Sequence, residues 1–241
     1  MLLVGNGRLI TRDEAFPYAE DGAVALDGEV IKEVGALSEL RAKYPDAEFV
    51  DARGGVIMPG LINVHTHIYS GLARGLSIDG FNPTNFLEVL DGQWWYIDRH
   101  LTLDGTRACA YATVLDCIRD GVTTIFDHHA SFCEIPGSLF AIKDVCQELG
   151  IRANLCYEVS ERDGAEKCGQ AIRENADFAR WAKEQDDDMI KAMFGGHALF
   201  TISDKTFEQM VKANDGMTGF HIHVAEGMND VYDSLRNYGC R

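Results

Sequence analysis

The chain has 241 residues, of which 46% are hydrophobic and 25% charged, as in a globular protein with one large domain or one domain plus a small appendage. Lysine and arginine number 22 and aspartate and glutamate 38, so the formal net charge is −16. Because so acidic a surface repels phosphate backbones and anionic membranes, we expect neither nucleic acid nor a membrane as a partner.

The cysteine pattern and the N-terminus indicate where the protein works. The 7 cysteines are scattered and form no C-x-x-C pair, which argues against a disulfide framework or a thiolate zinc site and favours a reducing compartment. The opening MLLVGNGRLI is too briefly apolar for a signal peptide, and no stretch is long enough to span a membrane. We therefore expect a cytoplasmic protein.

Residues 1–55 predict a β-rich segment, which we assign to a small β-sandwich domain. Within it, AVALDGEVIKEVG predicts a hairpin that turns at Asp27-Gly28, a favoured tight-turn pair. SELRAKYPDA predicts a short helix ending near Pro45, and EFVDARGGVIMPG predicts a return to extended structure.

Residues 56–241 predict alternating strands and helices. The first long helix, DGTRACAYATVLDCIRDG, is expected to place Ala108, Ala112, Leu115 and Ile118 on one face. The predicted strands are LINVHTH, VTTIFDHHA, IRANLCYEV, IKAMFGGHALF and TGFHIHVAE, and the predicted helices cover residues 104–121, 137–150, 164–185 and 204–214, with a last run to residue 239.

Five such strand–helix units predict an α/β fold with a parallel sheet. Polar residues cluster where the strands end, as at the active face of a (β/α)8 TIM barrel, whereas no G-x-G-x-x-G follows the first strand to favour a doubly wound sheet. We therefore predict an incomplete barrel over residues 56–241. A closed barrel needs more units, so either the chain is part of a longer protein or something else completes it.

The sharpest local signal is a pair of H-x-H motifs. Side chains two residues apart on a strand point the same way, so His65 and His67 are directed at one spot, and His221 and His223 repeat the pattern on the fifth strand. A single pair is also compatible with a half-buried strand. Two pairs at matching strand ends favour a metal site.

The motifs VIMPGLINVHTH and HIHVAE resemble the first-strand and fifth-strand signatures of the amidohydrolase superfamily. The likeness is greatest to the branch of the guanine, adenosine and cytosine deaminases, S-adenosylhomocysteine deaminases and triazine hydrolases. It extends over the whole chain, including GVTTIFDHHA and GGHALFTIS. This resemblance implies that the chain is an N-terminal part of such an enzyme.

The resemblance assigns roles to individual residues. His65, His67 and His223 correspond to metal ligands, and Glu226 to the acid that moves protons, whereas His221 is expected to pack outside the ligand set. Relatives with two metal ions bridge them with a carboxylated lysine at the end of the fourth strand. Here the only lysine near that strand is Lys191, at its beginning, so we expect one divalent metal ion, with zinc favoured over iron.

The implied reaction is deamination of a purine, pyrimidine or related nitrogen heterocycle, a small-molecule substrate, by a homodimeric enzyme. Guanine itself is in doubt, because Ser70 stands where guanine-deaminase-like relatives carry a glutamine. Hydrolysis of a ring halide or a cyclic amide and a catalytically inactive half-barrel are the alternatives. The residues expected to contact the substrate are Ser70, Trp95, His197 and one of the pair His128 and His129.

Overall fold

The computed structural model of the chain describes residues 1–185 and 187–240. Its contacts separate into two compact units, Met1–Gly60 and Leu61–Arg241, which we describe one at a time. Asp186 and Arg241, which the predicted barrel segment includes, lie outside the described residues.

The first unit is a five-stranded sheet with strand order β3-β2-β1-β4, in which β5 also pairs with β1. The predicted hairpin is present, but its two-residue loop is Gly28–Glu29, one position later than expected, and Gly28 adopts the positive φ that such a loop requires. Leu3, Ala23 and Leu40 pack in its core. The elements are β1 (Leu2–Ile10), β2 (Tyr18–Asp27), β3 (Val30–Ala36), α1 (Leu37–Lys43), β4 (Glu48–Asp51) and β5 (Val56–Ile57).

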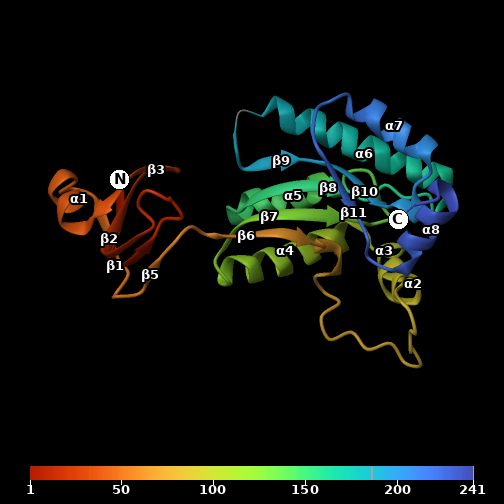
Figure 1. Cartoon of the computed structure of the whole chain (residues 1–241), viewed down its shortest axis with the longest axis horizontal. Helices are drawn as coiled ribbons and strands as arrows, with labels where there is room; N and C mark the ends of the chain where they lie inside the picture. The colour runs from red at the N-terminus through yellow and green to blue at the C-terminus, as the bar shows by residue number, and fades with distance from the viewer. Residues whose placement is uncertain (186, 241) are drawn as a thin grey trace. The chain divides into compact units, whose positions relative to one another are not determined.

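The second unit alternates strands with helices, as the sequence predicts (Figure 1). Its strands are β6 (Leu61–Thr66), β7 (Val122–His129), β8 (Arg152–Tyr157), β9 (Ile190–Ala192), β10 (Phe194–Ala198) and β11 (Phe220–His223). Its long helices are α4 (Leu103–Arg119), α5 (Ser138–Leu149), α6 (Gly164–Glu184), α7 (Asp204–Asn214) and α8 (Met228–Tyr238), and short turns η1 (Ile68–Ser70), α2 (Phe86–Val89), η2 (Leu90–Trp94), α3 (Trp95–Asp98) and η3 (Leu199–Thr201) complete it.

All strand pairings in this unit are parallel, in the order β6-β7-β8-β9 and β10-β11. The prediction of one strand over 190–200 is wrong, because the chain changes partner there: Met193 N–H donates to Leu155 of β8, and Phe194 N–H donates to Gly219, beside β11. Gly195 allows this crossing, since a Cβ at that position would lie 2.2 Å from the carbonyl oxygen of Tyr157. The strand ends that carry the histidines are thereby brought to one edge.

The helices form a layer in which α4 contacts α5, α5 contacts α6 and α6 contacts α7. The predicted inner face of α4 is wrong: Leu115 and Ile118 are exposed, whereas Cys109, Ala110 and Val114 are buried. The small side chains of Cys109 and Ala110 let the helix approach its neighbours closely. Among the residues that the structure describes, none of the helices combines the length and apolar character that a membrane crossing needs.

Candidate functional site

Three histidines converge where β6 and β11 end, and we call His65, His67 and His223 the histidine centre. The Nε2 atom of His65 lies 3.0 Å from that of His67 and 3.2 Å from that of His223. The Nδ1 atom of His67 faces the carbonyl oxygen of His128 at 2.9 Å, and that of His223 faces the carbonyl of His197 at 3.1 Å. Because a carbonyl only accepts, each Nδ1 carries the proton and each Nε2 presents a lone pair.

The protonation of these rings supports the same arrangement. Burial lowers the pKa of His67 to about 4 and also lowers that of His223, so both imidazoles are neutral at physiological pH. The Nε2 lone pairs of His67 and His223 both face the Nε2 atom of His65, so a cation placed among the three rings would be bound by nitrogen donors from two strands.

The donor set fits a divalent metal ion. Zinc–nitrogen bonds of about 2.0–2.1 Å in tetrahedral geometry place two ligand nitrogens about 3.3 Å apart. The two Nε2 separations from His65, 3.0 and 3.2 Å, are close to this value. The backbone carbonyls that bind the Nδ1 protons orient the rings of His67 and His223, as carbonyls commonly do for metal-ligating histidines.

Asp127 holds the segment that follows His67 in place. Its Oδ1 accepts a hydrogen bond of 2.6 Å from the backbone N–H of Ile68, the first residue of η1. Asp127 is buried on β7, and burial raises the pKa of its carboxyl to about 8. The sequence shows this aspartate at a strand end but gives no sign that it caps the loop from another strand.

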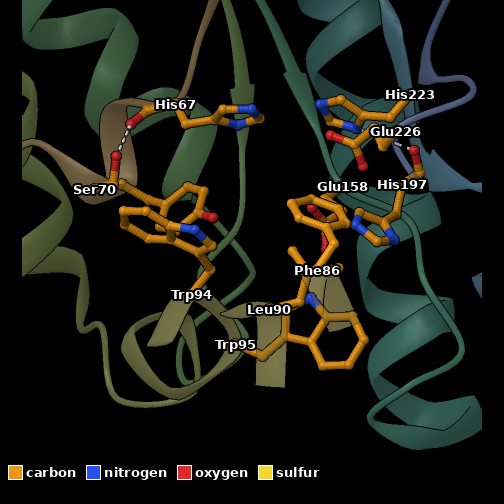
Figure 2. Close-up of a pocket in the computed structure, with 11 residues that line it drawn as sticks. His67, Ser70, Phe86, Leu90, Trp94, Trp95, Glu158, His197, His223 and Glu226 are labelled. Carbon is orange, nitrogen blue, oxygen red and sulfur yellow. Dashed lines mark hydrogen bonds between the residues drawn. The ribbon is translucent and has the colours of Figure 1, made fainter. Parts of the chain in front are cut away.

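A cavity of about 220 Å³ opens beside the histidine centre (Figure 2), smaller than a pocket for a drug-sized ligand. Figure 2 shows His67 and His223 extending towards each other from opposite sides of this pocket. Glu226 lies near His223 at the rim, where partial desolvation raises the pKa of its carboxyl. The lining residues are His67, Tyr69, Ser70, Phe86, Leu90, Trp94, Trp95, Glu158, His197, His223 and Glu226.

Three of the predicted substrate contacts, Ser70, Trp95 and His197, line this pocket. Ser70 donates its hydroxyl to the carbonyl oxygen of His67 at 2.8 Å. Neither His128 nor His129 belongs to the described lining, contrary to the expectation that one of them faces the pocket. Both are fully buried, because His128 packs against the rings of His67, His221 and His223 and His129 packs against those of Tyr69 and Tyr157.

A second group of possible ligands lies at the same strand ends. The Sγ of Cys156 lies 3.5 Å from Nδ1 of His221 and 3.7 Å from Nδ1 of His128. Burial raises the pKa of the Cys156 thiol well above its usual value, and the thiol donates a hydrogen bond to the backbone carbonyl oxygen of Asp127 at 3.4 Å.

Glu158 of the same pocket belongs to a group that the sequence did not assign to the site: Asp98, Glu158 and Arg162, which we call the ionic cluster. The Arg162 guanidinium binds both oxygens of Asp98, at 3.2 and 2.5 Å, and Oε1 of Glu158 at 3.0 Å. It also lies over the ring of Phe132, 4.0 Å from its centroid. All three charged side chains are almost completely buried.

Charges within the ionic cluster compensate for the loss of water at Arg162 and Glu158, whereas at Asp98 burial outweighs the Arg162 charge and raises the pKa to about 7. Burial lowers the pKa of Arg162, but the carboxylates of Glu158 and Asp98 outweigh it and raise the pKa above its usual value. Burial likewise raises the pKa of Glu158, whereas His197 and Arg162 lower it, with a net lowering. Because burial lowers the pKa of His197 itself, the permanent charge of Arg162 is the effective cause.

The model of the amidohydrolase family matches residues 56–241, and an imidazolonepropionase-like composite domain from bacteria matches residues 22–47. The 5'-deoxyadenosine deaminase of Methanobrevibacter smithii is 29% identical over 91% of this chain and 48% of its own length. The 5-methylthioadenosine/S-adenosylhomocysteine deaminase of Thermoanaerobacter pseudethanolicus is 26% identical over 99% of this chain and 52% of its own. The chain spans about half the length of the curated relatives it matches.

Solved structures share the fold. Atrazine chlorohydrolase from Arthrobacter aurescens TC1, complexed with zinc, superposes with a TM-score of 0.81 at 22% identity, over 100% of this chain and 56% of its own. An adenosine deaminase from Xanthomonas campestris with bound zinc superposes with a TM-score of 0.77 at 23% identity, over 100% of this chain and 53% of its own. These similarities confirm the predicted fold class, a TIM-barrel type with about five strand–helix units that follow a β-rich segment along the chain.

Proposed function

This chain belongs to the amidohydrolase family, and from that premise we propose that it carries the metal-binding and ring-binding part of an aminohydrolase acting on a nitrogen heterocycle. The observation that carries the proposal is the convergence of three imidazole Nε2 atoms, from His65, His67 and His223, beside an acid and an aromatic pocket. The deaminases among its relatives support the same reaction class.

His65, His67 and His223 would hold one divalent metal ion. Three imidazole nitrogens suit zinc in a catalytic site, and we propose zinc on the basis of this donor set. A metal ion held there would supply Lewis acidity and activate water at neutral pH. The backbone carbonyls of His128 and His197 orient the rings of His67 and His223, and burial lowers the pKa of these two rings and keeps them unprotonated.

Glu226 is the group we propose for proton transfer. Deamination adds the oxygen of water to a ring carbon, breaks the bond from that carbon to the amino nitrogen and releases ammonia, so protons must move from water to the ring and the leaving nitrogen. The Glu226 carboxyl lies beside His197 and His223, with its ligand-capable atoms within 4.8 Å of theirs. Its raised pKa brings it closer to neutrality, where a carboxyl both takes up and gives up a proton readily.

Aromatic side chains shape the rest of the pocket for a flat molecule. Tyr69, Phe86, Trp94 and Trp95 line it, and such faces stack on heterocyclic rings. Arg74 is a cation near the end of the first barrel strand, but it pairs with Asp116 at the surface and is not among the residues that line this pocket. A small uncharged nitrogen heterocycle is therefore the substrate class we propose.

The test is ammonia release by the purified, zinc-loaded whole protein across a panel of amino-substituted purines, pyrimidines and triazines. We expect ammonia from at least one ring. Glu226→Gln should lower kcat by about a hundredfold to ten-thousandfold, because it removes the group that transfers protons. The control is Glu208→Gln, an exposed glutamate of α7 that should leave kcat unchanged.

Two outcomes would contradict the proposal. One is that no ring releases ammonia, and release of chloride from a chlorotriazine in the same panel would then favour halide hydrolysis. The other is that Glu226→Gln and Glu208→Gln lower kcat to the same extent.

A further inference from the structure

We infer that Glu158 is a substrate-binding residue whose free carboxylate oxygen accepts a hydrogen bond from an N–H group of the ring, so that the pocket selects heterocycles with an N–H edge. The inference rests on the proposed function, because it names the chemical class of ring that the same pocket takes. Glu158 follows β8 directly, is buried and lines the pocket.

The two oxygens of Glu158 have different surroundings. Oε1 accepts from Arg162 at 3.0 Å. In the part of the chain that the structure describes, Oε2 has no hydrogen-bond partner, and Nε2 of His128 lies 3.8 Å from it. One oxygen is thus bound to the ionic cluster and the other remains available as an acceptor at the pocket wall.

The ionic cluster fixes the direction of this acceptor. Arg162 binds Glu158 with one terminal nitrogen while both of its terminal nitrogens bind Asp98, and the guanidinium lies against Phe132 and 5.0 Å from the ring centroid of Trp95. A planar guanidinium held on two sides presents its donors in a rigid geometry. Arg162 and Asp98 are therefore positioning residues for Glu158.

The charge of the pocket restricts the ligand further. Of the residues that line the pocket in the described ranges, none is lysine or arginine, whereas Glu158 and Glu226 both carry carboxyl groups. Arg162 cannot compensate a substrate anion, because its terminal nitrogens already bind three carboxylates: those of Asp98, Glu158 and Asp163. The pocket accordingly disfavours anionic ligands and favours neutral rings that offer donors.

Glu158 and Glu226 provide different contacts. Glu226 lies at the rim beside the histidine centre, whereas Glu158 lies deeper and is held by a permanent positive charge. A ring stacked on the aromatic side chains can meet both carboxyl groups at different atoms. Glu158 thus recognises the ring, and Glu226 moves protons.

The experiment compares two probes, 2-pyrimidinone and 1-methyl-2-pyrimidinone. In the second probe a methyl group replaces the hydrogen of the ring N–H. Their dissociation constants are measured on the zinc-loaded whole protein by quenching of tryptophan fluorescence, since Trp94 and Trp95 line the pocket. A charge-assisted hydrogen bond predicts that the wild type prefers the N–H probe by about tenfold to a hundredfold.

The variants assign that preference to Glu158. Glu158→Ala should abolish it, and Glu158→Gln, which keeps an oxygen near Arg162, should reduce it several-fold. If Glu158→Ala does not fold, Glu158→Gln carries the test, with thermal melting as the check on folding. Glu184→Gln, an exposed glutamate at the end of α6, removes the same charge and should leave the preference unchanged.

The inference is overturned if the wild type binds neither probe, binds both equally, or keeps its preference in the folded Glu158 variants. These results are distinct from failure of the proposed function. Ammonia release with an unchanged probe preference in the variants contradicts the N–H contact alone, whereas a Glu158-dependent preference without ammonia from any ring contradicts deamination alone.

Discussion

The histidine centre and the ionic cluster both contribute side chains to one pocket, and they differ in what each needs. The histidine centre brings the Nε2 atoms of His67 and His223 to 3.0 and 3.2 Å from that of His65, and burial lowers the pKa of His67 and His223, so these two rings carry no charge. The ionic cluster contains two carboxylates and a guanidinium that bind one another directly. The histidine centre needs a metal ion to join its nitrogen atoms, whereas the charged groups of the ionic cluster bind one another without an added ligand.

This difference predicts opposite consequences of mutation. A change in the histidine centre should abolish metal binding with little effect on the stability of the metal-free chain, since no ion pair is broken there. A change in the ionic cluster should destabilise the fold, since it leaves a charge buried without a partner. The experiments below measure both quantities for each variant, in order of expected effect.

The largest effect is expected for His67→Ala. Loss of a residue that only hydrogen-bonds to a metal ligand weakens metal binding by about 10- to 100-fold. Loss of His67, a direct ligand, should weaken it more, and activity should disappear with the metal. Metal content after dialysis and ammonia release provide the measurement, and the melting temperature without metal should barely change. His100→Ala, at an exposed histidine, is the control. Full metal content in His67→Ala would contradict the assignment.

The next effect is expected for Arg162→Met. It should lower the free energy of unfolding by about 3–5 kcal/mol, because Asp98 and Glu158 would remain buried without compensation. Urea denaturation without metal measures this change. Arg180→Met breaks an exposed pair with Asp177 and should change stability by only about 0–1 kcal/mol. Equal effects of the two substitutions would show that the ionic cluster is not electrostatically important.

At neutral pH the smallest of the three effects concerns Asp127, which accepts a hydrogen bond from the backbone N–H of Ile68. Its pKa of about 8 in the folded chain lies above its ordinary value of 3.8, so the folded state binds one proton more than the unfolded state between these values. The stabilisation is fully present below pH 3.8 and is lost as the pH rises through about 8, at about 1.4 kcal/mol per pH unit. Asp127→Asn should lack this slope, and parallel wild-type and variant curves of unfolding free energy against pH would contradict the assignment.

The sequence predicts the histidine centre better than the ionic cluster for a physical reason. His65 and His67 lie two residues apart, so the alternation of a strand is enough to place them on one side. Asp98 and Arg162 are separated by 64 residues, and their pairing depends on how α3 meets the loop after β8. No local periodicity contains that information.

Two other features differ from the prediction made from the sequence, and both arise from packing. The inner face of α4 is formed by Cys109, Ala110 and Val114 and not by the larger Leu115 and Ile118, because close approach of the helix matters more than side-chain hydrophobicity. The break between β9 and β10 depends on a change of partner strand, which the continuous apolar run does not reveal. Tertiary contacts decide both features.

The most direct test of the metal assignment is anomalous X-ray diffraction at the zinc edge from crystals of the zinc-loaded whole protein. The account predicts one peak on this chain, about 2.0–2.1 Å from the Nε2 atoms of His65, His67 and His223. A peak between His128, Cys156 and His221, or no peak beside the histidine centre, would contradict it.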